Sequence, residues 1–396
     1  MRNFFSVIVM MVVLGGFIGV YSYFFFRRIL HIFKAPVQKR SIKLVLILVA
    51  LIFTVLCINI FSFSAIIILH LVIIAMVVDI VNLIIKKIMN EKYNSVKVMK
   101  VWKKIHGLGI IPVIITAVLM IYGYYNMNHV VETDYRLYSD KTITAEADGT
   151  YRIALLADLH YGVSIDDEEL LRVCNEISKQ NPDMVVLCGD IVDENTTNEK
   201  MKTVFSTLAT IENKYGIFYV YGNHDRQLYN SQDKRAYTEA ELADYIKSCG
   251  IKILQDEVYS VNDEFTIIGR EDSSYNGGGN ALLASAGKRK ELSELMEGVD
   301  KDDFILVLDH QPKEYKENEA NGTDLLLSGH THGGQIWPGN IIFNILKFDD
   351  AVYGETVGEN SSFRAFVTSG VAGWGYPVKT AAPAEYVIID ITTNNN

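Results

Sequence analysis

Cysteine is scarce in this chain of 396 residues, and the four that it has follow no pattern. Cys57, Cys174, Cys188 and Cys249 lie far apart, and no Cys-x-x-Cys pair occurs. This argues against a disulfide framework and against a zinc ribbon. The simplest interpretation is that these cysteines are small buried hydrophobic residues.

Acidic residues are almost absent from residues 1–126, which hold fourteen Lys or Arg but only Asp79 and Glu91. This first part has a net charge of +12, whereas the rest of the chain has −22. We therefore predict a four-span transmembrane domain over 1–126, a linker over 127–150 and a catalytic domain over 151–396. Because nucleic-acid binding needs a basic surface, the acidic second part argues against a nucleic-acid partner.

Charged residues are missing from long apolar runs in the first part. Phe4–Phe26 is uncharged and reaches the ~20 residues that a membrane span needs. Leu44–Ile85 is about twice as long and is interrupted by Ser62-Phe63-Ser64, which predicts two helices joined by a tight turn. Ile105–Tyr125 makes a fourth span. The sequence thus predicts an all-α region of four transmembrane helices.

Basic residues gather in the loops after the first and third predicted spans. The positive-inside rule makes both loops cytoplasmic, and four spans then place both termini outside. We therefore expect a multi-pass cell-membrane protein with an extracytoplasmic catalytic domain. Asp79 and His70 fall inside the third span, where ionisable groups are often functional. The favoured alternative is that Asp79 reaches the membrane interface or pairs with Lys86 or Lys87.

Histidine is also rare, and the five residues that follow His129 all lie in short motifs. The motifs are Asp158-Leu159-His160, Gly222-Asn223-His224-Asp225, Asp309-His310-Gln311-Pro312 and Gly329-His330-Thr331-His332. A fifth motif, Gly189-Asp190-Ile191-Val192-Asp193, adds a carboxylate. Imidazole and carboxylate groups together suit Mn, Fe or Zn. Asp193 is ambiguous, since it is placed either to support the site or to cap the helix that begins near Asn195.

Apolar runs alternate with helical patterns from Tyr151 onward, which predicts an α/β fold. The predicted strands are 152–157, 184–188, 217–221, 265–268, 304–308, 324–327, 363–368 and 385–391. The predicted helices are 166–180, 197–211, 239–248 and 288–296. Each motif follows one of these strands, and ligands of such sheets bind beyond the carboxyl ends of the strands.

The spacing within the motifs suits two cations. Asp158 and His160 are two residues apart, so both can point at one ion, and Asp190 can lie between two ions. Two divalent cations, two carboxylates and one hydroxide leave a charge of +1, which suits a phosphodiester or phosphomonoester. Two such ions activate the nucleophile and neutralise phosphoryl oxygens.

The order of the five motifs resembles that of the calcineurin-like metallophosphoesterases, over about residues 150–392. The resemblance implies a four-layer α/β/β/α sandwich that holds two divalent metal ions, with Mn favoured. It implies that one ion is bound by Asp158, His160 and His332, and the other by Asn223, His310 and His330. Asp190 would bridge the ions, and His224, oriented by Asp225, would protonate the leaving group.

Longer strings around His310 and His330 resemble one branch of that family, the membrane-associated bacterial phosphodiesterases similar to UDP-diacylglucosamine pyrophosphatase. The Gly-x-Asp-Asp segment of this branch reads Gly269-Arg270-Glu271-Asp272 here, and Lys379 stands where the branch has arginine. Lysine lacks the bidentate fork of arginine, so we expect a different phosphate contact at Lys379.

The expected function is hydrolysis of phosphodiester or pyrophosphate bonds of a lipid-linked or envelope substrate, by attack of a metal-bound hydroxide. The alternative is a non-catalytic membrane sensor or docking protein whose phosphoesterase-like domain only binds metal. The aromatic segments Tyr275–Asn280 and Gly373–Pro377, with Trp337 and Trp374 nearby, are expected either to cover the site or to contact the bilayer surface. Substrate-binding residues and the oligomeric state stay open.

Overall fold

The computed structural model describes residues 2–141, 143, 149–162, 164–276, 289–359 and 362–393, and side chains from Val13 onward. The chain divides into two compact units. The first contains residues up to Gly123 together with Gly375–Pro377, and the second contains Tyr124–Trp374 and the residues from Val378 onward. The division falls close to the change in charge near residue 126.

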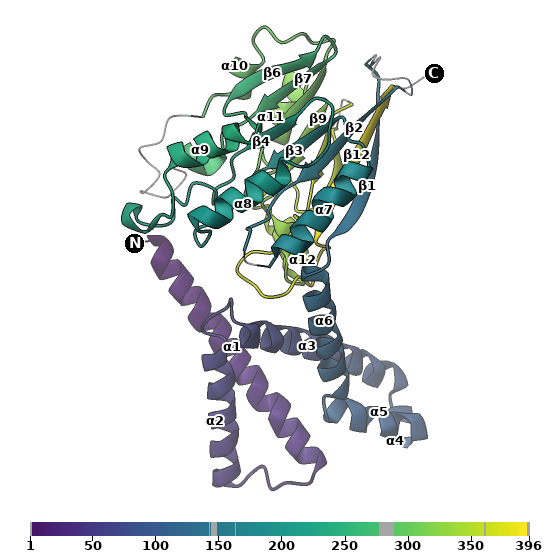
Figure 1. Ribbon diagram of the computed structural model, residues 1–396. Helices are drawn as coiled ribbons and strands as arrows, with labels where there is room; N and C mark the ends of the chain where they lie inside the picture. Colours follow the sequence, from purple (N-terminus) through teal and green to yellow (C-terminus); the bar gives the residue numbers. More distant parts are fainter. Residues whose placement is uncertain are drawn as a thin grey trace. The chain divides into compact units, whose positions relative to one another are not determined.

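The first unit is helical (Figure 1). Its helices are α1 (Arg2–Ile32), α2 (Arg40–Leu56), α3 (Phe63–Met89), α4 (Lys92–Ser95), α5 (Lys97–Gly107) and most of α6 (Ile110–Met127). In the described part of the chain, three segments are long and apolar enough to cross a membrane: Val13–Ile32, Phe63–Met89 and Ile110–Met127.

Three of the four predicted spans thus have a counterpart among these segments. The predicted span in α2, a helix of 17 residues that ends before Cys57, stays a prediction. The interruption predicted at Ser62–Ser64 lies slightly earlier, and Ser62 instead caps α3 by accepting a hydrogen bond from the Ala65 N–H. Since the orientation argument depends on the number of spans, the side of the membrane stays a prediction.

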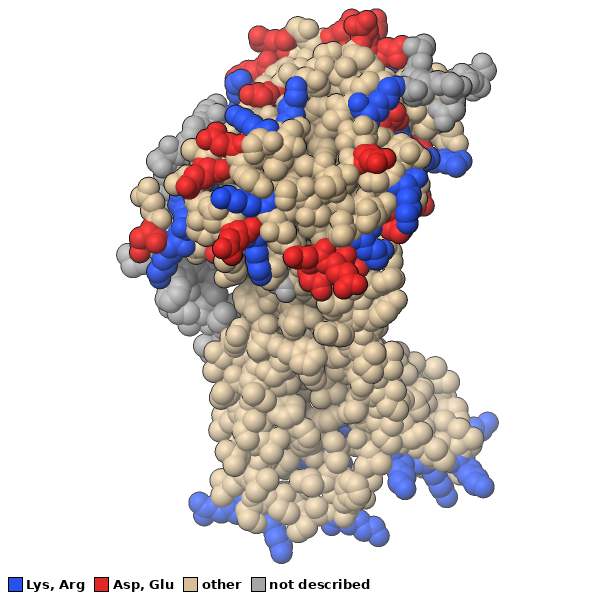
Figure 2. Space-filling view, viewed as in Figure 1, with Lys and Arg blue, Asp and Glu red and all other residues tan. Residues whose placement is uncertain are grey.

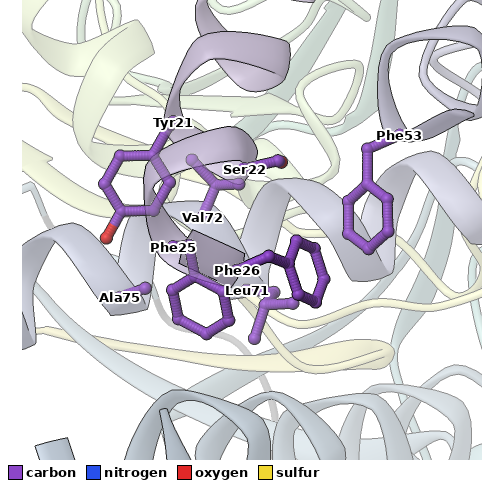
Figure 3. Close-up of a pocket in the computed structure, with 8 residues that line it drawn as sticks. All are labelled: Tyr21, Ser22, Phe25, Phe26, Phe53, Leu71, Val72 and Ala75. Atoms are coloured by element: carbon purple, nitrogen blue, oxygen red, sulfur yellow. The ribbon is translucent and has the colours of Figure 1, made fainter. Parts of the chain in front are cut away.

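The basic residues of this unit gather in the segments that connect the apolar helices, as the sequence predicts. Basic side chains gather at one end of the helical unit in Figure 2, and they come from the loop after α1 and from α4 and α5. Between α1, α2 and α3 lies a small apolar pocket, lined by the rings of Tyr21, Phe25, Phe26 and Phe53 together with residues of α3 (Figure 3). The apolar surface above the basic end suits a bilayer.

Asp79 of α3 is not paired with Lys86 or Lys87. Its carboxylate accepts hydrogen bonds from Tyr21 Oη at 2.7 Å and from Arg28, and its Oδ1 lies 2.7 Å from His106 Nε2. These partners tie α1, α3 and α5 together. The buried His70 ring has Nδ1 2.8 Å from the Ile66 carbonyl oxygen one turn earlier in α3.

The second unit contains two six-stranded sheets, which confirms the predicted α/β class. The first sheet has the order β1 (Val131–Ser139), β12 (Glu385–Thr393), β2 (Thr150–Leu156), β3 (Met184–Cys188), β4 (Ile217–Val220), β5 (Lys252–Ile253). The second has the order β10 (Gly354–Val357), β11 (Arg364–Val367), β9 (Leu325–Ser328), β8 (Phe304–Leu308), β7 (Phe265–Gly269), β6 (Glu257–Asn262).

Three hydrophobic clusters hold this unit together. One contains side chains from both sheets, among them Ile153, Val186, Leu306 and Leu327. A second joins the other face of the first sheet to α7 (Asp167–Lys179), α8 (Asn198–Leu208) and α9 (Glu239–Ser248). The third joins the second sheet to α10 (Leu292–Leu295) and α11 (Tyr315–Asn321). Burial on both faces explains why the central strands are apolar throughout.

The segment 127–150, expected to be a linker, is corrected in part because it contains β1. This strand pairs in parallel with β12 from Val131 to Ser139. Its charged residues Glu132, Asp134 and Arg136 alternate with more apolar ones, as an edge strand with one covered face allows. The short elements β5, β6, β10, α11 and α12 (Gly339–Leu346) were not predicted either.

Candidate metal centre

The five motifs lie at the carboxyl ends of five strands from both sheets. Strands β2, β3 and β4 are parallel neighbours in the first sheet, and β8 and β9 are parallel neighbours in the second. The motif side chains follow these strands within a few residues: Asp158 and His160, Asp190, Asn223 and His224, His310, and His330 and His332. The two sheets thus deliver ligand-type side chains to one place.

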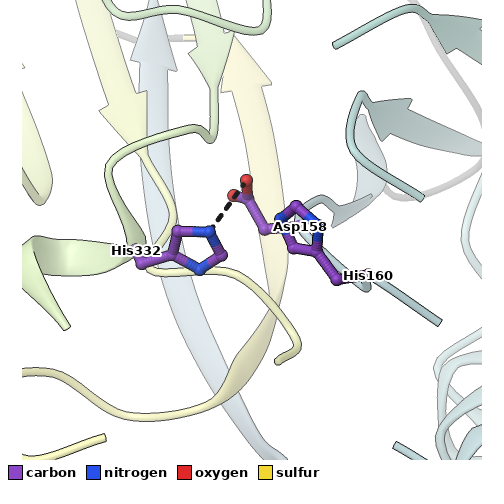
Figure 4. A group of neighbouring side chains, drawn as sticks. All are labelled: Asp158, His160 and His332. Atoms are coloured by element: carbon purple, nitrogen blue, oxygen red, sulfur yellow. Dashed lines mark ion pairs between the residues drawn. The ribbon is translucent and has the colours of Figure 1, made fainter. Parts of the chain in front are cut away.

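These side chains form two groups. Asp158, His160 and His332 make the first group, and Asp190, His310 and His330 make the second; in each group the candidate ligand atoms all lie within 4.8 Å of one another. Figure 4 shows the first group, with the His332 ring and the Asp158 carboxylate turned toward each other at 3.7 Å.

Asp190 lies between the two groups. Its Oδ2 is 3.1 Å from His310 Nε2 in its own group and 3.7 Å from His160 Nε2 in the other. Its Oδ1 accepts a hydrogen bond from the backbone N–H of His224 at 2.9 Å. The position of this carboxylate is the one that a bridging ligand would need.

The backbone at the motifs is unusually tight. Asp158, His160, Asp190, His330 and His332 all have positive φ, a conformation that is rare for residues with side chains and that concentrates at functional sites. The glycines of the motifs allow this packing. A Cβ on Gly329 would lie 2.5 Å from Asp158 Oδ2, and one on Gly222 would clash with the Asp190 carboxylate.

Hydrogen bonds to the backbone orient two imidazoles. His310 Nδ1 lies 2.8 Å from the Cys188 carbonyl oxygen, and His332 Nδ1 lies 3.3 Å from that of Ala372. With Nδ1 acting as the donor, Nε2 keeps its lone pair for a cation, which is the usual arrangement around a metal-bound histidine.

In the part of the chain that the structure describes, some buried polar atoms of the site have no hydrogen-bond partner, among them atoms of His160 and Asn223. Both ring nitrogens of His160 and the Oδ1 atom of Asn223 are buried and accept or donate no hydrogen bond within the described residues. Buried polar atoms are rarely left unpaired, so such atoms point to a missing ligand. Imidazole nitrogens, carboxylates and an amide oxygen are donors that divalent transition metals accept, so the site fits two such ions.

Burial shifts the pKa values of this site. It raises the pKa of Asp158 to about 7 and lowers that of His332 to about 3, and the pKa of His160 is lowered as well. The imidazoles of His160 and His332 are therefore neutral and have a lone pair available, whereas at His310 burial is outweighed by the neighbouring Asp190 carboxylate, which raises the pKa of that imidazole. The charge of the Asp158 carboxylate, in contrast, is costly to bury without a nearby cation.

His224 is positioned by Glu194, a residue that was not predicted. Its Nδ1 lies 2.6 Å from Glu194 Oε2. Burial lowers the pKa of His224, but the carboxylates of Asp190 and Glu194 outweigh this and raise it to about 9. The imidazole is therefore protonated at neutral pH, as a proton donor has to be.

Asp225 does not orient His224, which corrects the expected role of Asp225. Its two carboxylate oxygens accept hydrogen bonds from the backbone N–H groups of Gly222, Asp190, Ile191 and Val192. The fully buried carboxylate therefore joins the loop after β4 to the loop after β3. The Asp225 side chain is directed back into the turn, and the carboxylate bound to the His224 ring is that of Glu194, from another loop.

Asp193 supports the site and does not cap a helix, because α8 begins at Asn198 and its cap is Thr197, whose side chain accepts a hydrogen bond from the Lys200 N–H. The Oδ1 atom of Asp193 accepts hydrogen bonds from the Asn195 N–H and the Thr196 hydroxyl, which shapes the turn before α8. Its Oδ2 lies 3.8 Å from His160 Nδ1, on the side of the ring that faces away from Asp190. Asp193 thus supports both the turn and the first group.

Lys379 is placed to support the site, not to contact phosphate, which corrects the expectation for this residue. Its side chain is 0% exposed. The ammonium group donates to the carbonyl oxygens of Ser369, Gly370 and Ala372. Ala372 is also the carbonyl partner of His332, so Lys379 holds the turn that orients this ring.

The comparisons with known proteins agree with this geometry. Residues 151–334 match the family model of the calcineurin-like phosphoesterases. An uncharacterized metallophosphoesterase from Campylobacter jejuni is 30% identical over 61% of this chain and 59% of its own length. A transmembrane protein with a metallophosphoesterase domain from Danio rerio is 27% identical over 70% of this chain and 61% of its own. The chain spans about three fifths of each relative.

Among solved structures, a dimetal phosphatase from Danio rerio has 13% identity and a TM-score of 0.36, with 55% of this chain and 86% of that chain covered. Both the identity and the TM-score are low for this structure. The family match and the relatives support a calcineurin-like phosphoesterase domain, but not the narrower branch similar to UDP-diacylglucosamine pyrophosphatase. Together with the three apolar helices, the transmembrane relative supports membrane association.

Proposed function

We propose that this protein is a membrane-anchored phosphoesterase that uses two divalent cations to hydrolyse phosphodiester or pyrophosphate bonds. The observation that carries the proposal is the set of unpaired buried atoms on His160 and Asn223, together with two groups of ligand-type side chains between which Asp190 lies. Bound cations would give these atoms the partners that buried polar atoms usually have.

In this proposal each group holds one ion. Asp158, His160 and His332 would hold the first ion, Asn223, His310 and His330 would hold the second, and Asp190 would serve both. Mn²⁺ is favoured over Fe and Zn, and two sheets with helices on their outer faces form the proposed four-layer α/β/β/α sandwich. When bound, the ions supply a nucleophilic oxygen at neutral pH and neutralise the phosphoryl oxygens.

The residues of the chain do the rest. His224 holds a proton at its Nε2 atom, because Nδ1 is bound to Glu194, and gives it to the departing oxygen of the substrate. Asp225 takes no direct part in the reaction but fixes the loops that carry Asp190 and His224. Lys379 keeps the His332 ring in place through Ala372.

The proposed substrate is a lipid-linked or envelope phosphoester on the extracytoplasmic side. The catalytic unit begins at Tyr124, within the last apolar helix (Ile110–Met127), so this helix would tether the unit to the bilayer. A tether raises the effective concentration of substrates that share the membrane. The positive-inside distribution of basic residues supports the external location.

The test uses the full chain purified in detergent, with all metal removed and then returned. We expect two Mn²⁺ per chain and turnover of an aryl phosphodiester, with both lost after chelation. Asp158→Asn should bind fewer ions and lose turnover. Binding of two ions without turnover on phosphodiesters, phosphomonoesters and pyrophosphates would instead support the metal-binding sensor or docking protein.

A further inference from the structure

Two aromatic rings flank the proposed proton donor. The Trp374 ring centroid lies 4.9 Å from that of His224 at an interplanar angle of 36°, and the Tyr229 centroid lies 5.1 Å away at 42°. Trp374 is also 6.4 Å from His160 in the first ligand group. The rings therefore stand directly beside the place where the leaving group would depart.

Trp374 is held in this place by Gln335, which follows the motif Gly329–His332 by three residues. The Trp374 backbone N–H donates to Gln335 Oε1 at 3.0 Å, and the Gln335 amide nitrogen donates to the Val378 carbonyl oxygen at 3.2 Å. The Gln335 carbonyl oxygen accepts from the N–H groups of Thr380 and Ala381. One side chain thus joins the end of the Gly-His-x-His motif to the loop that carries Trp374.

Tyr229 comes from the loop after β4 and is 43% exposed. Its hydroxyl oxygen accepts a hydrogen bond from Asn223 Nδ2 at 3.4 Å, which leaves the unpaired Oδ1 of Asn223 for the second ion. The ring itself is not used by that contact. The ring lies beside His224 and the residue is partly exposed, so a substrate group that approaches His224 could contact it.

We propose that Trp374 and Tyr229 form a leaving-group subsite that selects substrates whose departing alcohol carries a flat ring. This rests on the proposed function, since it takes His224 as the proton donor. The departing oxygen must come within hydrogen-bond reach of His224 Nε2, because Nδ1 is bound to Glu194. The atoms attached to that oxygen then lie near both aromatic rings, at the spacing of 4.5–7 Å at which rings stack.

A ring that stacks on an aromatic side chain gains about 5- to 100-fold in affinity. An unbranched alkyl group gains less from the same surface, because it covers less of the ring face. The subsite should therefore distinguish substrates by the shape of the leaving alcohol, and not by its acidity.

The experiment compares two phosphodiesters that differ only in the leaving alcohol, benzyl or methyl, since these alcohols have similar acidity. In the full chain loaded with Mn²⁺, Trp374→Ala should lower kcat/KM for the benzyl ester about 5- to 100-fold more than for the methyl ester. Trp374→Phe should keep most of the benzyl preference. Bound metal is measured in each variant.

Tyr229 gives a second, exposed position that is tolerant of truncation. Tyr229→Ala should lower the benzyl preference, whereas Tyr229→Phe should keep it and change only the contact with Asn223. Tyr138→Ala is the matched control, because this tyrosine is 59% exposed and lies far from the site. It is the strand partner of Thr392, and Thr392 is the strand partner of Thr150 at the end of β2 opposite to the site.

Binding of benzylphosphonate and methylphosphonate by calorimetry tests the subsite without turnover. We expect tighter binding of benzylphosphonate by the wild type and loss of that preference in Trp374→Ala. Equal loss for both esters and both phosphonates would overturn the subsite, as would an octyl ester that depends on Trp374 as strongly as the benzyl ester. A wild type that prefers benzylphosphonate but turns over neither ester would refute the proposed function alone.

Discussion

Each of the two units contains a cluster of ionisable side chains. The clusters differ in whether their ligand-type atoms have hydrogen-bond partners within the cluster. In the helical unit, both oxygens of Asp79 have protein partners, from Tyr21, Arg28 and His106. In the catalytic unit, both nitrogens of His160 and the Oδ1 atom of Asn223 have none within the described residues. In the helical cluster the carboxylate is fully paired and the unpaired atom is a donor, Arg28 Nε, whereas the unpaired atoms of the catalytic cluster include ligand atoms, which suit a bound cation.

The backbone separates the clusters in the same way. Asp79, Arg28 and His106 lie on regular helices. Five of the candidate metal ligands, in contrast, have positive φ. Strain of this kind persists only where the surrounding structure enforces it, and it favours a functional role for the second cluster.

The largest expected effect is at the residue that joins the two ligand groups. Asp190→Ala should reduce turnover by about a thousandfold or more, the upper range for removing one fixed charge from an active site. Bound Mn²⁺ should fall below two per chain, as measured by elemental analysis. The exposed Asp302→Ala is the control, and an unchanged metal content in Asp190→Ala would contradict the bridging role.

The next effect separates proton donation from metal binding. His224→Ala should keep two ions and lose about 10²- to 10⁴-fold in kcat on an alkyl phosphodiester, as expected when a general acid is removed. The loss should be smaller for aryl leaving groups, which need no proton. Glu194→Gln should show the same dependence on the leaving group in weaker form, and wild-type rates of alkyl ester cleavage in His224→Ala would rule out the assignment.

A smaller effect is expected at the residue that supports the first ligand group from behind. Lys379→Met should weaken binding of one of the two ions by about 10- to 100-fold, as removal of an outer hydrogen-bond partner does in metal sites. The second ion should be little affected. Titration of the metal-free protein with Mn²⁺ measures both steps, and equal weakening of both would mean that Lys379 only maintains the fold.

The smallest effect on activity is expected in the helical unit. Asp79→Asn should leave kcat/KM and metal content unchanged and lower the thermal stability of the full chain by about 0.6–2 kcal/mol, the range for polar contacts between membrane helices. Thermal unfolding in detergent measures this change. Loss of turnover with unchanged stability would make this cluster functional and remove the contrast between the units.

The sequence alone determined the fold class and the positions of the candidate ligands. Strands β3 and β8 have the predicted bounds, because a run of apolar residues buried on both faces has one simple interpretation. The motif side chains follow their strands as predicted, since parallel strands bring their carboxyl ends to one edge. The family resemblance was equally readable, because it depends on local strings such as Gly222–Asp225.

Other features were decided only by the tertiary structure. Glu194, not Asp225, contacts His224, and Lys379 lies beneath the site instead of facing phosphate. The edge strand β1 exists because β12, more than two hundred residues later, offers it a partner. The physical reason is the same in each case: local sequence fixes which atoms need partners, but only the folded chain determines which distant residues supply them.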